Sequence, residues 1–213
     1  MKTVLTFLIA LTIHPTFAQK VSDLFTANEV QITWLGIDYS EVKIIGEFSQ
    51  FMGAGEKSAV QIKDRYFSAW NKLVLAEQNK YDIRGMLRKE HINFDLDMVM
   101  SLNDAVAVEN LEAYQTPNYT IEDMFKFIKK YDLKGKSGIG IILLAESLNK
   151  NTQEAYYHFM ALNLSSGELL LHERIKGIPS GIGIRNYWAG SIYDAFKSIQ
   201  KKYYPSWRKE YRK

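Results

Sequence analysis

The stretch "GIGIILLAESL", residues 138–148, is almost entirely apolar. A strand that is covered on both faces has this composition, whereas a strand with one solvated face alternates apolar and polar residues. The segment therefore predicts a central strand of a β-sheet, with other elements packed on both of its faces.

The clearest hairpin of the chain follows this segment. The runs "EAYYHFMALNL" (154–164) and "ELLLHERIKG" (168–177) are separated by Ser165, Ser166 and Gly167. Two runs rich in aromatic and aliphatic residues around a short turn that contains Gly predict a pair of antiparallel strands. This hairpin extends the sheet beyond its central strand.

The remaining periodic segments predict further strands and helices. We expect strands over 29–38 and 42–46, joined by a turn near Asp38, and a half-buried strand in "HINFDLDMVM", 91–100, which alternates. We expect helices over 58–77, from Thr120 onward, and from Asn186 to Pro205. This order predicts an α/β (α+β) fold: a single domain whose mixed, partly antiparallel sheet carries about three helices.

The N-terminus has the pattern of a secretory signal peptide. Lys2 precedes an apolar run over 4–13, and Pro15 and small residues then lead to Ala18. The run is too short to cross a bilayer, which takes about 20 apolar residues, and Pro15 disfavours the alternative of a core helix. We expect residues 1–18 to be removed, leaving 19–213 as one exported domain without a transmembrane segment. The absence of Cys fits a bacterial periplasm or exterior.

The net charge of +3 is too modest to favour nucleic acid as a partner of an exported protein. Basic residues nevertheless gather in the C-terminal tail: Lys197, Lys201, Lys202, Arg208, Lys209, Arg212 and Lys213. A solvated helix face is the favoured interpretation. The alternative is a weak contact with an anionic surface, such as lipid headgroups or an acidic partner.

Three short patterns resemble phosphate-binding loops, and each lacks a required residue. In "ITWLGIDYSEVKIIG", 32–46, Asp38 is followed by Tyr39 where the loop of the actin-like ATPases needs Gly and a hydroxyl. Gly135-Lys136-Ser137 has Lys130 at the position of the first P-loop Gly. The "GIGIRN" segment, 181–186, ends in Asn where the dinucleotide pattern needs Gly or Ala. We therefore predict no cofactor.

Metal ligation has two weak candidate sets. One is His91, Asp95 and Asp97, which would share a strand face if 91–100 is extended. The other is His158 and His172, which become diagonal neighbours if Leu164 pairs with Glu168; a slip of one residue would separate them. The solvated face of a strand explains the first set, and the second has no evident third ligand, so we predict no metal.

No catalytic residue is predicted. The chain has no G-x-S-x-G, no H-E-x-x-H and no Cys nucleophile. Asp38 and Glu146 stand at expected strand ends and could form a pair of carboxylates like that of a glycosidase, although turn chemistry is the commoner role of such residues.

A partner-binding site is predicted at the start of the last helix. Arg185, Asn186 and Tyr187 follow a Gly-rich loop, and Arg and Tyr are frequent in binding hot spots. Tyr187 lies about 100° round the helix from Trp188, which belongs to the apolar stripe, so Tyr187 should be the more exposed of the two. The alternative is that both aromatic residues only cover the sheet.

Long stretches of the chain resemble a group of exported proteins of Gram-negative bacteria for which no function is established: "VQITWLGIDYSEVKIIGEFSQF", "GMLRKEHINFDLDMV", "GIGIILLAESLNK" and "LLLHERIKGIPSGIGIRNYWAGSIYDAFKSI". More loosely, 138–203 is similar to periplasmic domains of the TolB N-terminal, CsgG and penicillin-binding-protein-activator type, although this chain lacks a lipid-anchor Cys. That resemblance implies a non-catalytic binding or envelope-assembly module whose partner is another envelope protein. The alternative is a hydrolase or metal-dependent enzyme acting on envelope material.

Overall fold

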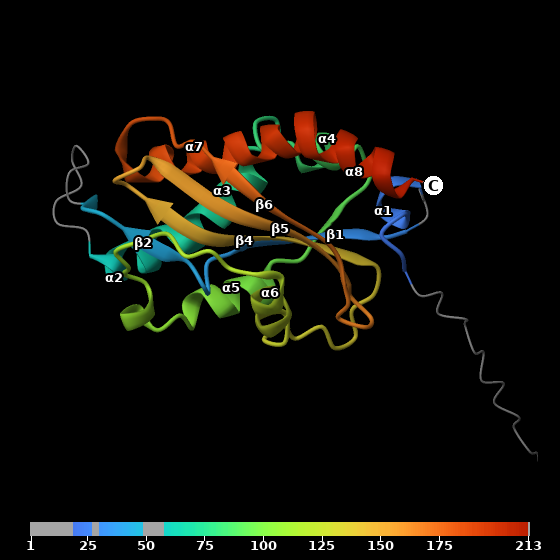
Figure 1. The fold of residues 1–213 in the computed structure, drawn as a ribbon, viewed down its shortest axis with the longest axis horizontal. Helices are drawn as coiled ribbons and strands as arrows, with labels where there is room; N and C mark the ends of the chain where they lie inside the picture. The colour runs from blue at the N-terminus through green and yellow to red at the C-terminus, as the bar shows by residue number, and fades with distance from the viewer. Residues whose placement is uncertain (1–18, 27–29, 49–57, 213) are drawn as a thin grey trace, which may run out of the picture.

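A computed structural model describes residues 19–26, 30–48 and 58–212 (Figure 1). The predicted leader, 1–18, and Lys213 lie outside the described residues. The strands are β1 (Ile32–Asp38), β2 (Lys43–Ile45), β3 (Asn93–Phe94), β4 (Ile139–Asn149), β5 (Glu154–Asn163) and β6 (Leu169–Gly177). The α-helices are α1 (Asp23–Thr26), α2 (Ala59–Ile62), α3 (Ser68–Ala76), α4 (Ile83–Leu87), α5 (Asp97–Asp104), α6 (Ile121–Ile128), α7 (Gly183–Ser198) and α8 (Tyr204–Tyr211).

Three shorter helical turns complete the described elements. A π-helical turn over Lys63–Phe67 joins α2 to α3, and a second one over Ile199–Tyr203 joins α7 to α8. A 3₁₀ turn spans Val108–Asn110. Each π turn lies inside a continuous helical stretch, so the predicted helix over 58–77 is one stretch in the structure.

The described strands form one mixed sheet in the order β3-β1-β4-β5-β6, with β2 also paired to β4. β1 and β2 both pair in parallel with the same side of β4, one after the other along its length. On the other side, β5 pairs antiparallel with β4, and β6 pairs antiparallel with β5. Every residue of β4 is buried. The predicted mixed, partly antiparallel sheet with a central apolar strand and a C-terminal hairpin is confirmed.

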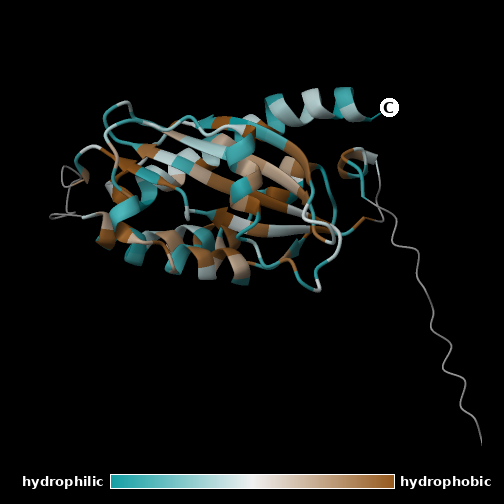
Figure 2. Ribbon diagram, turned by 60° about the horizontal axis from the view of Figure 1, so that its bottom comes forward, coloured by the Kyte–Doolittle hydropathy of each residue, from teal (hydrophilic) through white to brown (hydrophobic). Residues whose placement is uncertain are grey.

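Helices cover both faces of the sheet (Figure 1). The larger core lies between the sheet and α3, α4, α7 and α8, and it is rich in aromatic residues such as Trp34, Trp70 and Trp188. The smaller core on the opposite face joins Leu35, Ile142 and Met160 to α5 and α6. Figure 2 shows brown, hydrophobic stretches along the strands, whereas the helices carry both brown and teal residues.

Some local predictions were wrong. The strand expected over 91–100 is limited to Asn93–Phe94, because α5 begins at Asp97 and packs Val99 into the smaller core. Asn186 does not cap the last helix, which begins at Gly183. Pro205 does not end that helix either. It lies at the start of α8, directly after the π-helical turn that joins α7 to α8.

Two buried amide side chains complete the edge of β1 beyond the short β3. The Ile37 N–H donates to Asn71 Oδ1 at 2.7 Å, and the Ile37 carbonyl accepts from Asn71 Nδ2 at 2.9 Å and from Asn103 Nδ2 at 3.0 Å. The Tyr39 N–H donates to Asn103 Oδ1 at 2.6 Å. Asn71 comes from α3 and Asn103 from α5, so the two amides tie both helical layers to the same strand.

Gly36 makes room for this arrangement. Its φ of +114° belongs to the region that favours glycine, and a Cβ there would lie 2.8 Å from Asn71 Oδ1. Gly36 also follows the irregularity in β1 that turns Leu35 toward the smaller core.

We expect Asn71→Ala to lower the free energy of unfolding by about 1–3 kcal/mol, because it leaves the buried Ile37 N–H without a partner. Urea denaturation measures the change. The control is Asn79→Ala, an exposed residue whose loss should cost less than about 0.5 kcal/mol. Equal effects of the two substitutions would contradict the assigned role of Asn71.

Candidate functional site

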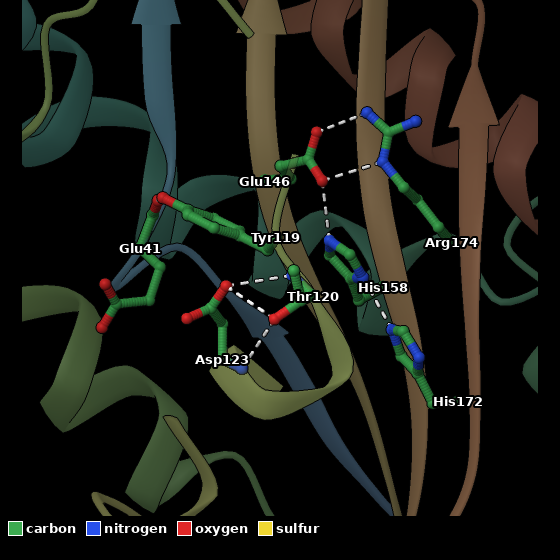
Figure 3. Close-up of polar contacts among 8 residues, drawn as sticks. All are labelled: Glu41, Tyr119, Thr120, Asp123, Glu146, His158, His172 and Arg174. Atoms are coloured by element: carbon green, nitrogen blue, oxygen red, sulfur yellow. Dashed lines mark hydrogen bonds and ion pairs between the residues drawn. The ribbon is translucent and has the colours of Figure 1, made fainter. Parts of the chain in front are cut away.

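A buried carboxylate, Glu146, is the centre of the most connected polar cluster in the structure (Figure 3). The pairing of β4 with β5 shifts register between Ala145 and Ser147, so Glu146 is the extra residue of a β-bulge. Bulges redirect side chains, and here the carboxylate points toward β5 and β6 on the sheet face that also carries the smaller core. Glu146 is the one charged residue of β4, and it has no exposed surface.

Arg174 of β6 and His158 of β5 hold the Glu146 carboxylate. The Arg174 guanidinium donates to both carboxylate oxygens, at 2.5 Å and 2.9 Å, and His158 Nε2 lies 2.8 Å from Oε2. Burial acts to raise the pKa of Glu146, but the Arg174 and His158 bonds together outweigh it and the pKa lies below its ordinary value. Glu146 is therefore an ionised group whose charge is compensated inside the protein.

His158 links this carboxylate to a second histidine. His158 Nδ1 lies 2.7 Å from His172 Nε2, and the two rings are nearly parallel. The register of the hairpin places His158 opposite Arg174 and Met160 opposite His172, so the predicted diagonal arrangement of the two histidines is confirmed. His158 is fully buried, whereas His172 is half-buried at the edge strand.

Both ring nitrogens of His158 are occupied by protein partners. A carboxylate only accepts, so the His158 Nε2–H donates to Glu146. In a neutral His158 ring, Nδ1 then accepts from the Nε2–H of His172, and Nδ1 of His172 remains as an acceptor at the partly exposed end. Burial and the neighbouring His158 lower the pKa of His172 to about 4. The arrangement can relay a proton, but its histidine nitrogens face one another and Glu146 and do not converge on a shared ligand.

Tyr119 lies beside His158, with its ring centroid 6.2 Å from that of the imidazole. Its hydroxyl donates to the Glu41 carbonyl at 2.8 Å. The next residue, Thr120, caps α6 in a reciprocal capping box with Asp123, which confirms the predicted start of this helix. Figure 3 shows how this capped turn places Tyr119 between Glu41 and the histidine.

Arg174 has a second contact that restricts its side chain. The guanidinium lies over the Tyr156 ring at 3.7 Å from the centroid, and the Arg174 side chain is 33% exposed. Tyr156, on β5, is thus part of the support for the ion pair. The bond to Glu146 raises the pKa of Arg174, which therefore remains charged.

The other predicted metal and carboxylate sets are not brought together. His91 is exposed, Asp95 pairs with Lys136, and Asp97 lies in the first turn of α5. In the described part of the chain, the structure contains no group of three or more His, Cys, Asp or Glu residues that could hold a metal ion.

Asp38 and Glu146 have separate partners. Asp38 accepts from the Ser40 N–H and from the Tyr131 hydroxyl, each at 2.7 Å. The bond to Ser40 confirms that Asp38 tightens the turn that follows β1. Burial raises the pKa of Asp38, so the two carboxylates differ in environment and do not form a glycosidase-like pair through a common contact.

The predicted partner site lies in the first turns of α7. Arg185 and Asn186 are exposed, and Tyr187 is half-buried whereas Trp188 is fully buried, so Tyr187 is the more exposed of the two aromatic residues, as predicted. Tyr187 packs edge-on against Trp188, with 5.1 Å between the ring centroids, and Lys150 lies over its ring. Tyr187 is therefore partly a packing residue.

Two kinds of site residue were not predicted. Arg174 was not predicted because in the sequence it is one of several polar residues of a hairpin. Only the bulge at Glu146 makes it the partner of a buried carboxylate. Ile178 and Ile182, 45% and 82% exposed, are apolar residues that lie in the connection before α7. The position of Ile182 between two glycines was the one sequence feature that could have indicated these exposed residues.

A comparison of the chain with models of protein families and with curated proteins finds no match. Over the described residues, no helix has the length and apolar character that crossing a bilayer requires.

We expect Arg174→Met to lower the free energy of unfolding by about 3–5 kcal/mol, since it leaves the Glu146 charge buried without its main partner. The double variant Glu146→Gln, Arg174→Met should recover much of that loss, because no charge is then buried. Chemical denaturation monitored by circular dichroism measures both.

Lys176→Met is the matched control for this strand. Lys176 pairs with Glu154 at the surface, so its loss should cost less than about 1 kcal/mol. If Arg174→Met costs no more than Lys176→Met, Glu146 does not depend on the guanidinium.

A second prediction concerns acid. The pKa of His172 is about 4 in the folded protein and 6.5 ordinarily, so the unfolded chain takes up this proton at the higher pH. The free energy of unfolding should fall as the pH drops below 6.5, and this loss should be complete below pH 4. Urea midpoints across this range should therefore decline less for His172→Asn than for the parent protein. A variant at exposed His91, His91→Asn, should keep the parental slope; identical slopes for all three proteins would refute the assignment.

Proposed function

We propose that this chain is an exported, non-catalytic binding module of the bacterial envelope, and that another envelope protein docks on the connection between β6 and α7. The observation that carries the proposal is the 82% exposure of Ile182, immediately before the first turn of α7. Single exposed apolar residues are common on protein surfaces, but Ile178 in the same connection is also 45% exposed. The connection and the start of α7 thus offer a partner two exposed isoleucines and the exposed Arg185.

The backbone of this connection is held in a defined shape. Gly181 and Gly183, on either side of Ile182, have φ values of +114° and +77°, which present the isoleucine outward. The Ser180 N–H donates to the Tyr187 carbonyl at 3.1 Å, and the Ile178 N–H donates to Asp194 at 2.9 Å. These bonds anchor the loop on both sides of its exposed tip.

The start of α7 is anchored to the core as well. Trp70 Nε1 donates to the Arg185 carbonyl at 2.9 Å, which links the helix start to α3. A surface that is already ordered loses less conformational entropy when a partner binds. The anchored loop, the exposed Ile182 and the exposed Arg185 therefore have the features of a preorganised protein-binding site.

The polar cluster around Glu146 supports a structural role better than a catalytic one. Both carboxylate oxygens accept hydrogen bonds from the protein, and Arg174 balances the charge. A general base or nucleophile needs an available lone pair near a substrate. Export and the location of the partner rest on the signal-peptide pattern of residues 1–18 and on the resemblance of the chain to exported proteins.

One observation favours the second candidate, a hydrolase or metal-dependent enzyme that acts on envelope material. The Glu146, His158 and His172 chain ends in a half-buried imidazole whose pKa is about 4, so His172 is uncharged at neutral pH and its Nδ1 can accept a hydrogen bond. A buried carboxylate that orients a histidine also occurs in hydrolytic triads. This candidate requires that substitution of His172 abolish an activity.

We expect a photo-crosslinking amino acid at position 182 to capture an envelope protein in the native source cells, whereas the same amino acid at position 114 should not. Tyr114 is fully exposed and thus equally accessible, which makes it a matched control. Ile182→Ser and Arg185→Ala should lower the yield of a crosslink formed from position 178, without a change in melting temperature beyond a few degrees.

Three outcomes would contradict the proposal. The first is equal capture of the same proteins from positions 182 and 114. The second is an intact leader in the mature protein by mass spectrometry. The third is one equivalent of zinc that is lost on His158→Ala, which would favour the enzyme.

A further inference from the structure

The far end of the molecule from the β6–α7 connection carries a cluster of arginines. Arg208 and Arg212 come from α8, and Arg88 comes from the residue that ends α4. Arg212 is the residue that follows the last turn of α8, and Arg88 contacts the ring of Tyr204 at the start of that helix. Figure 1 places α8 at the opposite end of the α7–α8 stretch from the β6–α7 loop, and Figure 2 shows α8 as one of the most hydrophilic helices. We refer to Arg88, Arg208 and Arg212 as the arginine patch.

Geometry brings these residues together. Tyr204, Arg208 and Arg212 are spaced by four, which places them along one side of the helix. The Arg88 guanidinium lies over the Tyr204 ring, 5.1 Å from its centroid. Tyr204 itself is buried against Phe25 of α1, with 5.3 Å between the ring centroids, so the patch has a rigid aromatic base.

The arginines of the patch lack acidic partners. Within residues 19–26, 30–48 and 58–212, the structure shows no carboxylate oxygen within 4.0 Å of any of the three guanidinium groups, although it pairs Arg174 and several lysines in this way. Burial raises the pKa of Tyr204, while Arg208, Arg88 and Arg212 act to lower it, which is consistent with three cations around one phenol.

Nearby carboxylates are engaged elsewhere. Asp23 Oδ2 accepts from the Lys20 N–H at 2.8 Å, and Glu173 Oε2 accepts from Trp207 Nε1 at 3.4 Å. These carboxylates keep their charge, but within the described residues none of them forms an ion pair with a guanidinium group of the patch.

Arg88 occupies an unusual backbone position. It caps α4 with a φ of +51°, in the left-handed region where glycine or asparagine is the usual residue at a helix C-terminus. A residue with a Cβ is disfavoured in this region. The backbone conformation at position 88 therefore favours glycine or asparagine over arginine. The guanidinium of Arg88, however, adds a positive charge to the patch.

We propose that the arginine patch binds the phosphate groups of an anionic lipid surface. Guanidinium groups match phosphate oxygens with two parallel hydrogen bonds. Arg208 and Arg212 stand about 6 Å apart along the helix axis, and Arg88 lies beyond Tyr204, so the patch extends over more than one phosphate. Exposed Lys201, Lys202 and Lys209 continue the positive charge along the same stretch. A surface that carries several phosphates fits this charge distribution better than one isolated oxyanion.

The inference is independent of the docking site proposed above, because the two surfaces lie at opposite ends of the molecule. The patch combines basic residues near the C-terminus with Arg88. This residue follows α4 and is more than 100 positions away from Arg208 in the sequence. Membrane attachment at this end would leave Ile182 and Arg185 free to meet a protein partner.

The test is sedimentation of the protein, residues 19–213, with vesicles of phosphatidylglycerol and phosphatidylcholine at low salt. A basic residue near an anionic surface contributes about 1 kcal/mol, which corresponds to about fivefold in the partition coefficient. The triple variant Arg88→Asn, Arg208→Gln, Arg212→Gln should therefore bind on the order of 100-fold more weakly. Asparagine keeps the left-handed backbone at position 88, so the variant should fold.

The matched control removes three exposed cations elsewhere, in Lys72→Gln, Arg84→Gln, Lys134→Gln. It lowers the net charge by the same amount, and it should retain most of the binding. Circular dichroism melting curves verify that both triple variants are folded.

Binding that is strong for the parent, weak for the patch variant and absent on pure phosphatidylcholine supports the proposal. An equal loss in the two triple variants would overturn it, since net charge alone would then be responsible. The proposal also fails if the parent protein does not sediment with anionic vesicles at low salt. Capture of an acidic protein through the patch, without vesicle binding, would likewise replace lipid by protein as the ligand.

Discussion

The buried charge of Glu146 constrains more of this structure than any other single group. An ionised carboxylate without solvent is tolerated only with close and well-oriented partners, and the partners here come from two other strands. Arg174 must lie opposite His158, which requires one register of the hairpin, and Glu146 must leave the regular alternation of β4, which requires the bulge. A register slip of one residue would send Arg174 and His172 to the other face of the sheet and leave the carboxylate unpaired.

The same principle operates at the opposite edge of the sheet. β3 pairs with β1 over only two residues, so the backbone of Ile37 would be left without partners. Asn71 and Asn103 supply them from helices on the two faces. In both places a buried polar group is hydrogen-bonded to a segment that is distant in the sequence. At β1 these hydrogen bonds also connect the two helical layers to the sheet.

The proposed interaction surfaces lie outside these networks. The arginine patch and the β6–α7 connection are at the two ends of the α7–α8 stretch, which packs on the sheet through Trp188, Ile192 and Phe196. A continuous helical stretch with a buried apolar side keeps a fixed distance between its ends. The core thus acts as a rigid spacer between the two proposed interaction surfaces.

The amino-acid sequence by itself determined the elements whose signals are local. The apolar run of β4, the turn between β5 and β6, the apolar stripe of α7 and the helix start at Thr120 all depend on neighbours within a few residues, and each was predicted. The same holds for Asp38, which tightens its turn through Ser40, two residues away. The alternation over 91–100 was misleading because a period of two over a short segment does not exclude a helix start at Asp97.

Only the tertiary structure decided which polar residues meet. Glu146 and Arg174 are 28 positions apart, and their contact depends on a bulge that has no local sequence signal. Arg88 comes near α8 only because its guanidinium lies over the ring of Tyr204, and the exposure of Ile182 depends on how the loop before α7 leaves the sheet. Local patterns specify where helices and strands form, because those depend on nearby backbone and side-chain preferences. Convergence of distant side chains depends on packing of the whole chain, which no short stretch of sequence contains.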